Sequence, residues 1–546
     1  MSERSGHTDT FCADNLPPRE LWPTMDCSAL PDLAYPPRLN CAAGLLDDAV
    51  ASGRGESTVF LYDGSRWTYR QLLDAANQIA HVLRDDLGVA PGNRVLLRAP
   101  NTPMLAACWF AVLKAGGVVV STMPLLRPRE IAYTADKARI SLALTDARVA
   151  ADCERAMLSD EPGASRPGAR VVHFNSEAKD GLESLMRSKP VTFDNCDTSA
   201  EDIALIAFTS GTTGRAKGTM HSHRDVLAIT DCFARHVLKP EPSDLFCGSP
   251  PLAFTYALGG LLLFPMRFGA STLMLEQASP PNLIRAIQEH RPTVCFTAPT
   301  AYRAMLGMLS DFDVSSLRKC VSAGETLPAA TLEAWESATG LRIIDGIGAT
   351  EMLHIFISAS GDDIRPGATG RAIPGYEARV VDESGMPLPP GRIGLLEVRG
   401  PTGCRYLDDV DRQRTYVHDG WNRTGDSYLM DEDGYFWYQA RSDDMIVSSG
   451  YNIAAPEVEN ALLMHPDVHE CAVIGVPDPE RGSIVKAFVV LRPHARDNPP
   501  AARTLQDYVK SEIAPYKYPR AIEFVDTLPR TDTGKLQRFR LRDTTI

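Results

Sequence analysis

The chain has 546 residues, of which 44% are hydrophobic and 23% are charged, a balance that is typical of globular proteins and excludes a wholly disordered or fibrous chain. Its 56 Lys and Arg residues and 69 Asp and Glu residues give a formal net charge of −13. This charge argues against a general nucleic-acid binder, because such proteins carry clustered basic charge. At roughly 100–200 residues per domain, we expect more than one domain.

The twelve cysteines lie between Cys12 and Cys471 without a C-x-x-C pair, so the sequence predicts neither a disulfide framework nor a zinc cluster. The first thirty residues contain acidic residues and prolines but no apolar core of the kind that a secretory signal needs. The uncharged run Leu245–Met266 is interrupted by prolines and glycines, which favours buried core over a bilayer span. We therefore expect a soluble, cytoplasmic protein that does not enter membranes.

Residues 1–40 are rich in proline and have few periodic apolar residues, so we expect an irregular arm that lies on the surface of a domain. After this arm, apolar residues at helical spacing predict helices over 69–83 and 104–114. Short apolar runs predict strands at 94–98, 117–121, 140–145, 204–208, 273–275, 294–297 and 342–344. Helices that alternate with short buried strands indicate parallel-type α/β layers.

The pattern changes to strands and turns at about residue 377, where runs at 378–382 and 394–399 predict a small β region over 377–440. The sequence pattern changes again at Arg441. Pro456 suits the first turn of a helix, and further runs predict strands at 470–476 and 485–491 and a helix at 504–512. The predicted fold class is α/β. A large N-terminal domain, 1–440, has wound parallel-type sheets and the small β region, and a small, mobile α+β domain covers 441–546.

The densest chemical signal is Thr209-Ser-Gly-Thr-Thr-Gly-Arg-Ala-Lys-Gly218, which directly follows the strand predicted at 204–208. Small hydroxyl and glycine residues let backbone N–H and side-chain O–H groups surround phosphate oxygens, and Lys217 adds a cation. A Walker A loop requires Ser or Thr after its lysine, but Gly218 stands there. The alternative is a flexible surface loop. The predicted phosphate contacts are Thr209, Ser210, Gly211, Thr212, Thr213, Gly214 and Lys217.

With this loop, the chain resembles the acyl-adenylate-forming superfamily, which includes acyl-CoA synthetases, luciferases and peptide-synthetase adenylation domains. Five further segments match in family order: Ser322-Ala-Gly-Glu-Thr-Leu-Pro328, Asp345-Gly-Ile-Gly-Ala-Thr-Glu351, Thr424-Gly-Asp426, Arg441-Ser-Asp-Asp444 and Pro529-Arg-Thr-Asp-Thr-Gly-Lys535. The resemblance covers nearly the whole chain. It implies that ATP, CoA and Mg²⁺ take part in the reaction.

The resemblance also implies a role for each segment. Thr350 and Glu351 hold phosphate and Mg²⁺, and Lys535 and Lys217 are catalytic cations. The remaining ATP contacts are Ala323, Gly324, Glu325, Asp345, Gly346, Ile347, Gly348, the ribose-binding Asp426, and Arg441. Asp443 marks the hinge of the C-terminal domain, and Ser449, Gly450 and Tyr451 line the pantetheine tunnel.

Elementary chemistry supports these roles. Attack of a carboxylate on the α-phosphorus of ATP is catalysed mainly by positioning and by neutralisation of charge, which Lys535 and Mg²⁺ at Glu351 supply. Asp426 suits a ribose because a carboxylate accepts two hydrogen bonds. Any one of these residues alone is better explained by a surface ion pair or a helix cap. Their joint occurrence favours catalysis.

A narrower resemblance concerns Pro251-Leu-Ala-Phe-Thr-Tyr-Ala-Leu-Gly259 and Thr350-Glu-Met-Leu-His-Ile-Phe356, which are similar to the benzoate and 2-aminobenzoate CoA ligases. It implies a compact acyl pocket formed by Phe254, Tyr256, Ala323, Gly348, His354 and Ile355. Aromatic walls favour an aryl ring. Plain core packing is the alternative for Phe254 and Ile355. His354 could bind a ring substituent or the carboxylate, or be a satisfied buried imidazole.

The sequence therefore predicts an ATP-dependent, AMP-forming aryl-CoA ligase that acts through an aryl-AMP intermediate and releases AMP and pyrophosphate. The expected substrate is a small aromatic carboxylic acid, with 2-aminobenzoate placed before benzoate. Two alternatives stay open: a stand-alone adenylating enzyme that loads a carrier protein in trans, and a non-catalytic binding relative. Both the hinge and Lys535 argue against the second. Homodimers occur in the superfamily, and the sequence leaves the oligomeric state open.

Overall fold

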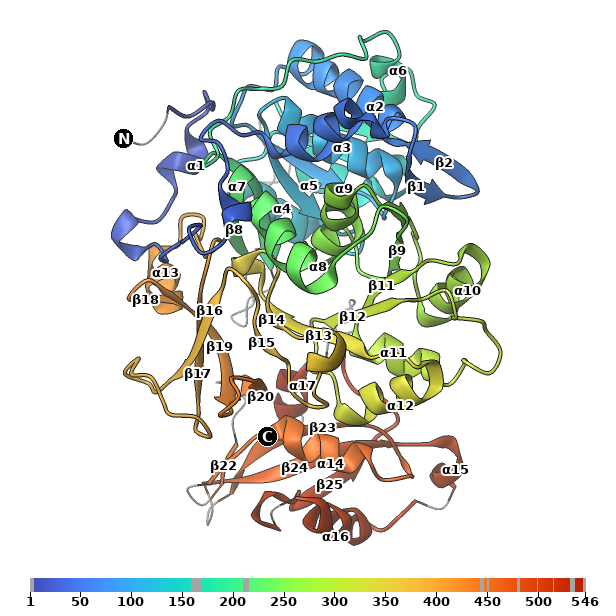
Figure 1. Ribbon diagram of the computed structural model, residues 1–546, viewed down its shortest axis with the longest axis vertical. Coiled ribbons are helices and arrows are strands. Elements are labelled where there is room, and N and C mark those ends of the chain that lie inside the picture. The colour runs from blue at the N-terminus through green and yellow to red at the C-terminus, as the bar shows by residue number, and fades with distance from the viewer. Residues whose placement is uncertain are drawn as a thin grey trace.

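The computed structural model of the protein describes residues 4–158, 168–209, 216–441, 446–448, 451–478, 482–497, 499–513, 515–530 and 536–543. Figure 1 shows two large sheets with their helices in the upper and middle parts of the molecule, a β region beside them, and a smaller C-terminal domain below. Within the described residues, no helix combines the length and apolar character that a bilayer crossing requires.

The first sheet has six strands, and its neighbours are parallel except for the final antiparallel pair. Their order is β6 (Arg170–Phe174), β5 (Leu142–Asp146), β3 (Arg94–Arg98), β4 (Val118–Thr122), β7 (Ile203–Thr209) and β8 (Lys217–Ser222). The helices of this part are α2 (Tyr69–His81), α3 (Pro103–Lys114), α4 (Pro128–Lys137), α5 (Ala151–Leu158), α6 (Leu182–Met186) and α7 (His223–Ile229). A capping box of Thr68 and Gln71 fixes the start of α2, because it satisfies two backbone N–H groups that lack helical partners.

The second sheet has nine strands, with a parallel centre and antiparallel pairs towards both edges. Their order is β15 (Arg371–Ala372), β14 (Ile355–Ser358), β13 (Ile343–Gly348), β12 (Lys319–Ala323), β11 (Val294–Thr297), β9 (Leu245–Gly248), β10 (Ser271–Leu273), β1 (Thr58–Tyr62) and β2 (Ser65–Thr68). The helices of this part are α8 (Thr255–Ala257), α9 (Phe264–Phe268), α10 (Pro280–His290), α11 (Pro299–Leu306) and α12 (Ala329–Thr339). One hydrophobic core extends through the helices of both sheets.

The β region is a five-stranded antiparallel sheet. It consists of β16 (Glu377–Val381), β17 (Ile393–Arg399), β18 (Val417–His418), β19 (Trp421–Met430) and β20 (Phe436–Arg441), with helix α13 (Val410–Tyr416). Buried Glu397 on β17 joins this strand to β16 and β19, because Arg379 and Arg423 each donate to its carboxylate. The sheet therefore forms at the position predicted for the small β region.

The C-terminal domain has its own cores around a three-stranded sheet. Its elements are β21 (Ile446–Ser448), β22 (Tyr451–Ile453), α14 (Ala455–Leu463), β23 (Val468–Asp478), β24 (Gly482–Leu491), α15 (Pro493–Arg496), α16 (Ala502–Glu512), β25 (Ala521–Phe524) and α17 (Arg538–Asp543). Pro456 lies in the first turn of α14, as predicted. The structure confirms the predicted α/β class with a small second domain. The boundary at 440/441 stays a prediction.

Two expectations need correction in detail. The strand predicted at 273–275 is β10, which begins at Ser271 and ends at Leu273. Thr272 belongs to it through its pairing with β1 and β9. Its hydroxyl can be buried because it donates to the Leu261 carbonyl, a contact that an apolar pattern does not reveal. The N-terminal arm is mostly irregular, but it contains the short helix α1 (Phe11–Asp14). Phe11 is buried in the core of the first sheet, and the Arg94 guanidinium lies 4.4 Å from its ring centroid.

Candidate functional site

The predicted phosphate loop lies between β7 and β8 of the first sheet. Thr209 ends β7 and Lys217 begins β8, and the two residues are partners in this antiparallel pair. Ser210, Gly211, Thr212, Thr213 and Gly214 lie outside the described residues, so their predicted contacts stay predictions. The Lys217 ammonium lies 5.8 Å from the centroid of the Tyr406 ring, which brings this cation to the next part of the site.

Glu351 lies in the 3₁₀ turn Thr350–Met352 and is nearly buried. The Tyr406 hydroxyl donates a hydrogen bond to Glu351 Oε1 at 2.6 Å. His221 on β8 fixes the same turn, because its Nε2 lies 2.8 Å from the Thr350 carbonyl and the ring is completely buried. Burial lowers the pKa of His221 to about 4, so this imidazole is neutral and donates from Nε2 to the carbonyl. Lys217, Thr350 and Glu351 therefore lie together, as predicted.

The Glu351 carboxylate fits a Mg²⁺ ion that also binds phosphate. Tyr406 occupies Oε1, and among the described residues no hydrogen bond reaches Oε2. The described part of the chain contains no group of three or more His, Cys, Asp or Glu that could hold a metal ion. Mg²⁺ in nucleotide sites is commonly held by one or two carboxylates together with substrate phosphates and water. This donor set matches a metal that arrives with ATP rather than one held by the protein alone.

The segments predicted to bind adenine and the acyl group lie side by side on β12, β13 and β14. Ser322 is the partner of Asp345, and Ala323 is the partner of Gly346. Gly348 in turn is the partner of Ile355 on β14. Close packing explains two of the glycines, because a Cβ at Gly346 would lie 2.8 Å from Ile355 and one at Gly348 would lie 2.8 Å from the His354 backbone. Ile347 lies between these glycines on β13.

Two polar atoms at this sheet edge are buried and have no hydrogen-bond partner among the described residues: Asp345 Oδ1 and Ser322 Oγ. Burial raises the pKa of Asp345 to about 7. Buried polar atoms are nearly always paired in proteins, so these two fit a ligand group such as the adenine or the ribose. Gly324, with φ of +88°, makes the turn after β12 that leads to Glu325.

The two residues predicted to contact the ribose are neighbours in the β region. The register of β19 and β20 pairs Asp426 with Arg441. Asp426 is 8% exposed, and its backbone N–H donates to the Thr424 hydroxyl at 3.2 Å. The Arg441 side chain is not described. Asp443, Ser449, Gly450 and Lys535 lie outside the described residues, and Tyr451 is described only as the first residue of β22.

His354 lies in a cluster of aromatic rings beneath β14. Its ring centroid is 4.6 Å from Phe264, 5.5 Å from Phe233 and 5.8 Å from Tyr256. Its Nε2 lies 3.3 Å from the Tyr256 carbonyl, so Nε2 carries the proton and Nδ1 is an acceptor. Burial lowers the pKa of His354 to about 3, which keeps the ring neutral. Nδ1 is buried and has no hydrogen-bond partner among the described residues.

Several residues of this cluster were not predicted from the sequence. Phe233, Phe264 and Phe296 belong to it, and Tyr406 belongs to the Glu351 site, although none of these lies in a recognised motif. The pair Gly259–Gly260 carried a signal for the cluster. A Cβ at Gly259 would lie 2.4 Å from the His354 ring, and one at Gly260 would lie 2.4 Å from the Phe296 ring.

Two of the six residues predicted for the acyl pocket, Phe254 and Ile355, lie outside the ring contacts of this cluster. Phe254 is half-buried at the residue before α8, and within the described structure it makes no ring contact with the cluster. Ile355 is buried and packs in the main core, which agrees with the packing alternative. Tyr256 lies in the cluster, with its hydroxyl 3.1 Å from the Val321 carbonyl. The other two, Ala323 and Gly348, lie on the adjoining strands.

His223, which the sequence places two residues after His221, does not join a metal site. It begins α7, and its Nδ1 lies 3.1 Å from Cys41 Sγ in a completely buried position. Burial lowers the pKa of His223 to about 3. His465 lies between α14 and the strand β23, and its Nδ1 accepts a hydrogen bond from the Asp467 N–H at 3.2 Å. Both residues therefore have structural roles.

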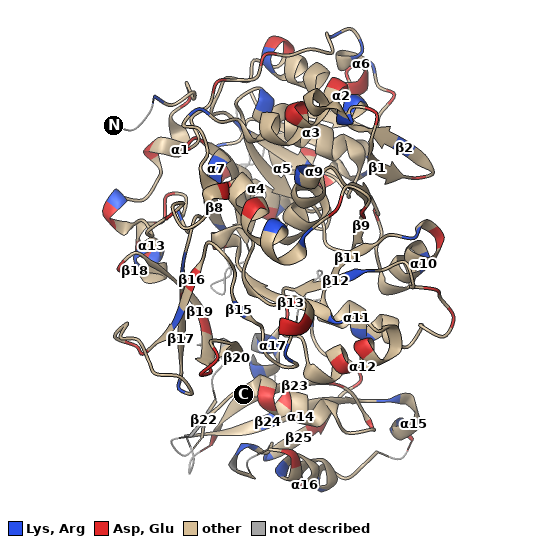
Figure 2. Cartoon of the chain, in the orientation of Figure 1, with Lys and Arg blue, Asp and Glu red and all other residues tan. Residues whose placement is uncertain are grey.

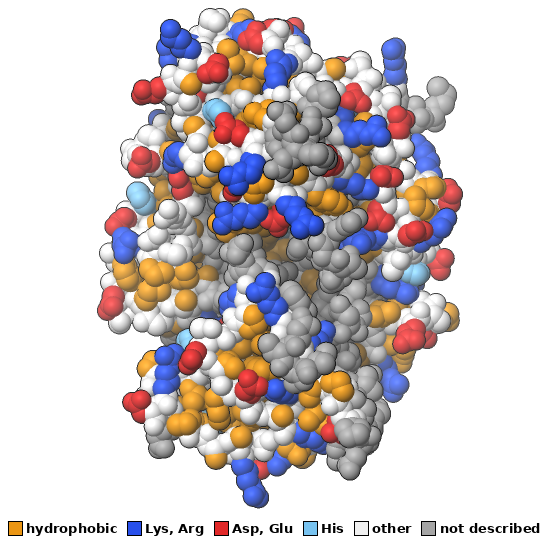
Figure 3. All heavy atoms as spheres, turned by 180° about the vertical axis from the view of Figure 1, so that it is seen from behind, with side chains coloured by type: hydrophobic (Ala, Val, Ile, Leu, Met, Phe, Trp, Pro, Cys, Tyr) orange, Lys and Arg blue, Asp and Glu red, His pale blue; other side chains and the backbone are white. Residues whose placement is uncertain are grey.

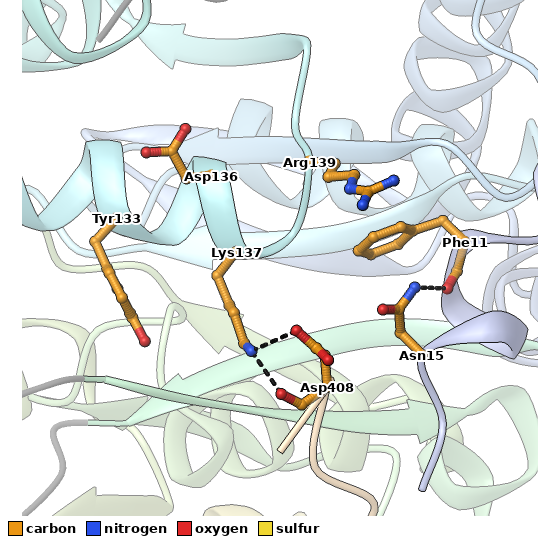
Figure 4. Close-up of a pocket in the computed structure, with 7 residues that line it drawn as sticks. All are labelled: Phe11, Asn15, Tyr133, Asp136, Lys137, Arg139 and Asp408. Carbon is orange, nitrogen blue, oxygen red and sulfur yellow. Dashed lines mark hydrogen bonds and ion pairs between the residues drawn. The ribbon is translucent and has the colours of Figure 1, made fainter. Parts of the chain in front are cut away.

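Two hollows on the surface lie apart from these groups. One, of about 330 Å³, lies between α1, the end of α4 and Asp408, where the Lys137 ammonium donates to the Asp408 carboxylate at 3.0 Å (Figure 4). The other, of about 700 Å³, lies beside the β1–β2 hairpin. Acidic and basic residues are mixed over the ribbon in Figure 2, whereas several Lys and Arg side chains gather near the middle of the face in Figure 3.

Comparison with known families identifies the class of protein. The profile of the AMP-binding enzyme family matches residues 47–405, which is more than half of the chain. The profile described as the AMP-binding enzyme C-terminal domain matches residues 457–535. The chain therefore belongs to the AMP-binding enzyme family. This membership confirms the predicted superfamily and agrees with the predicted class of enzyme.

Similar proteins include several CoA ligases. Benzoate–CoA ligase of Thauera aromatica is 35% identical over 521 residues, which cover 94% of this chain and 97% of that protein. The crystal structure of the anthranilate CoA ligase AuaEII in complex with anthranoyl-AMP is 36% identical, with a TM-score of 0.88 over 94% of this chain and 99% of that one. A benzoate CoA ligase from Burkholderia xenovorans LB400 is 33% identical, with a TM-score of 0.83 over 92% and 100% of the two chains.

Proposed function

We propose that the protein is an ATP-dependent aryl-CoA ligase that converts 2-aminobenzoate to its CoA thioester through an aryl-adenylate. Similarity to both benzoate and anthranilate CoA ligases supports an aromatic carboxylic acid as the substrate. The two acids differ by one amino group at the ring. The choice between them therefore depends on whether the acyl site offers that amino group a partner.

The observation that carries this choice is the buried Nδ1 of His354. The Tyr256 carbonyl fixes the tautomer, so Nδ1 is an acceptor, and no described residue donates to it. An aromatic amine is a hydrogen-bond donor, whereas unsubstituted benzoate offers only hydrogen atoms on carbon at the ring. Leaving a buried acceptor without a hydrogen-bond partner costs free energy. A ligand that donates to it therefore binds more tightly than a similar ligand that cannot.

The residues around Glu351 would serve the first half-reaction. Lys217 places a positive charge beside the predicted phosphate loop, and Asp426 and Arg441 would hold the ribose. Mg²⁺, when bound with ATP at Glu351, would neutralise phosphate charge during the displacement. Tyr406 and His221 hold Glu351 and the Thr350 backbone in place, so the carboxylate is preorganised before ATP binds.

The test is to incubate the enzyme with ATP and Mg²⁺, an aryl acid, and either CoA or a carrier protein, and to identify the thioester by mass spectrometry. We expect an aryl-CoA product with a higher kcat/KM for 2-aminobenzoate than for benzoate. A clear preference for benzoate would contradict the choice of acid. Thioester formation only on the carrier protein would favour the stand-alone adenylating enzyme.

We predict that His354→Phe lowers kcat/KM for 2-aminobenzoate by roughly three- to tenfold, as the loss of one neutral hydrogen bond implies, and changes that for benzoate much less. Phenylalanine keeps an aromatic ring in the cluster but removes the acceptor. The control is Tyr256→Phe, which removes a nearby hydroxyl and leaves Nδ1 in place. An equal effect of His354→Phe on both acids would show that the ring only packs.

A further inference from the structure

A network of four charged side chains crosses from the large domain to the C-terminal domain. Arg303 on α11 donates from Nη2 to Glu470 Oε1 on β23 at 3.5 Å. Glu470 also forms an ion pair with Arg530 of its own domain. Burial lowers the pKa of both arginines, and Glu325 opposes this shift in each of them. Arg303, Glu470 and Arg530 therefore meet at one contact, and Glu325 acts on both guanidinium groups electrostatically.

On the large domain, Arg303 is presented by a firmly anchored helix. Its neighbour Tyr302 is completely buried, with its hydroxyl 2.9 Å from the Cys295 carbonyl and its ring 4.9 Å from that of Trp335. The backbone N–H of Thr300, in the first turn of the same helix, donates to Glu325 Oε2 at 3.4 Å. Helix α11 thus connects the predicted adenine segment with the contact to the other domain.

On the C-terminal domain, Glu470 is joined through Arg530 to a bridge between two segments. Arg530 and Leu536 are partners in this antiparallel bridge, and the Gln537 N–H donates to the Pro529 carbonyl at 2.9 Å. Leu528, which precedes Pro529, belongs to the domain core. Glu470 therefore links this bridge to α11 of the large domain, in addition to the contacts of α14 with α12 and β20.

We propose that Arg303 is a positioning residue whose ion pair with Glu470 holds the C-terminal domain in the orientation used for aryl-adenylate formation. The assignment to this half-reaction follows from α11, which accommodates both contacts: its Thr300 N–H donates to Glu325 of the predicted adenine segment, and its Arg303 meets Glu470. It rests on the proposed function and on the hinge that the superfamily resemblance implies, about which the C-terminal domain would take a different orientation for each half-reaction. Glu470 is only 16% exposed, so water screens the pair less than it screens a surface pair.

The experiment measures the two half-reactions separately in Arg303→Gln, Glu470→Gln and the double variant. Pyrophosphate release from ATP and the aryl acid reports adenylation, and conversion of supplied aryl-adenylate with CoA reports thioester formation. We expect adenylation to fall about tenfold, as loss of a charged hydrogen bond implies, while thioester formation changes less than about twofold. The adenylation rate of the double variant should be no lower than that of the slower single variant, because the two single substitutions remove the same contact.

Two further variants serve as controls. Glu457→Gln breaks the Lys517–Glu457 ion pair within the C-terminal domain, and it should leave both half-reactions unchanged. Arg303→Lys keeps the positive charge and should retain most of the adenylation rate that Arg303→Gln loses. This comparison tests the ion pair even if Glu470→Gln does not fold. Equal loss of both half-reactions, or multiplying losses in the double variant, would overturn the proposal. If the wild-type enzyme releases pyrophosphate but forms no CoA thioester, the proposed function fails while the adenylation rates still test the contact.

Discussion

Asp345 has an unusual environment for a carboxylic acid. It lies on β13 beside Ser322 of β12, its Oδ1 is buried, and burial raises its pKa to about 7. The folded chain therefore keeps a proton that the unfolded chain releases above about pH 4. The free energy of unfolding consequently falls as the pH rises from about 4 to 7, and it is constant with respect to this group above that range.

We predict that Asp345→Asn removes this dependence, because an amide carries no charge at any of these pH values. The midpoint of thermal unfolding, measured for the variant and the wild type at pH 5 and pH 7.5, checks it. The difference, variant minus wild type, should be more positive at pH 7.5 than at pH 5. Equal differences at the two pH values would contradict the raised pKa.

At the scale of the element, the turn of helix over Leu258–Leu263 is shaped by its two glycines. Gly259 allows the His354 ring to pack directly on the helix backbone, and Gly260 does the same for Phe296. The helix therefore fixes the position of the imidazole that carries the proposed specificity. The glycine pair signals close packing in the sequence but does not identify its partners, because the contact with His354 joins residues almost a hundred positions apart.

We predict that Gly259→Ala costs about 1–3 kcal/mol of stability and lowers kcat/KM for the aryl acid, because the new methyl group overlaps the His354 and Phe264 rings. Thermal unfolding and steady-state kinetics measure the two effects. Gly307→Ala is the matched control, because its Cβ would meet no atom closer than 3.7 Å. Similar losses in both variants would argue against a specific overlap.

Much of the fold could be predicted because local patterns specify it. The strand expected at 94–98 is β3, and the one expected at 294–297 is β11, since short apolar runs between helices mark buried parallel strands. Thr350 and Glu351 were found because they are adjacent within one recognised motif, and Lys217 because it belongs to another. Tyr406 was missed because it reaches Glu351 from a loop 55 residues later, and no spacing rule relates the two.

At the scale of the whole molecule, a large domain built from two sheets and a β region meets a smaller C-terminal domain (Figure 1). Apart from Lys535, the residues proposed to bind phosphate, adenine and the aryl group belong to the large domain. The C-terminal domain contributes Glu470 and Arg530 to the contact between the domains. A reaction with two half-reactions therefore depends on both domains, although its binding residues lie mainly in one.

We predict that Asp443→Pro leaves aryl-adenylate formation largely intact and impairs thioester formation, because proline would restrict rotation at the proposed hinge. Lys535→Ala should have the opposite effect, with loss of pyrophosphate release but continued use of a supplied aryl-adenylate. The same pair of half-reaction assays measures both variants. Equal loss of the two half-reactions in either variant would contradict the corresponding role.

The buried imidazoles of His221, His223 and His354 have a consequence for the whole protein in acid. Burial lowers their pKa values to about 4, 3 and 3, whereas in an unfolded chain they would be close to 6.5. As the pH falls below 6.5, these three imidazoles bind protons in the unfolded chain but not in the folded one. The free energy of unfolding therefore decreases progressively towards pH 3. Asp345 has the opposite effect between about pH 7 and pH 4, because there the folded chain binds one proton that the unfolded chain does not. The burial that keeps these three rings neutral thus makes the enzyme sensitive to acid.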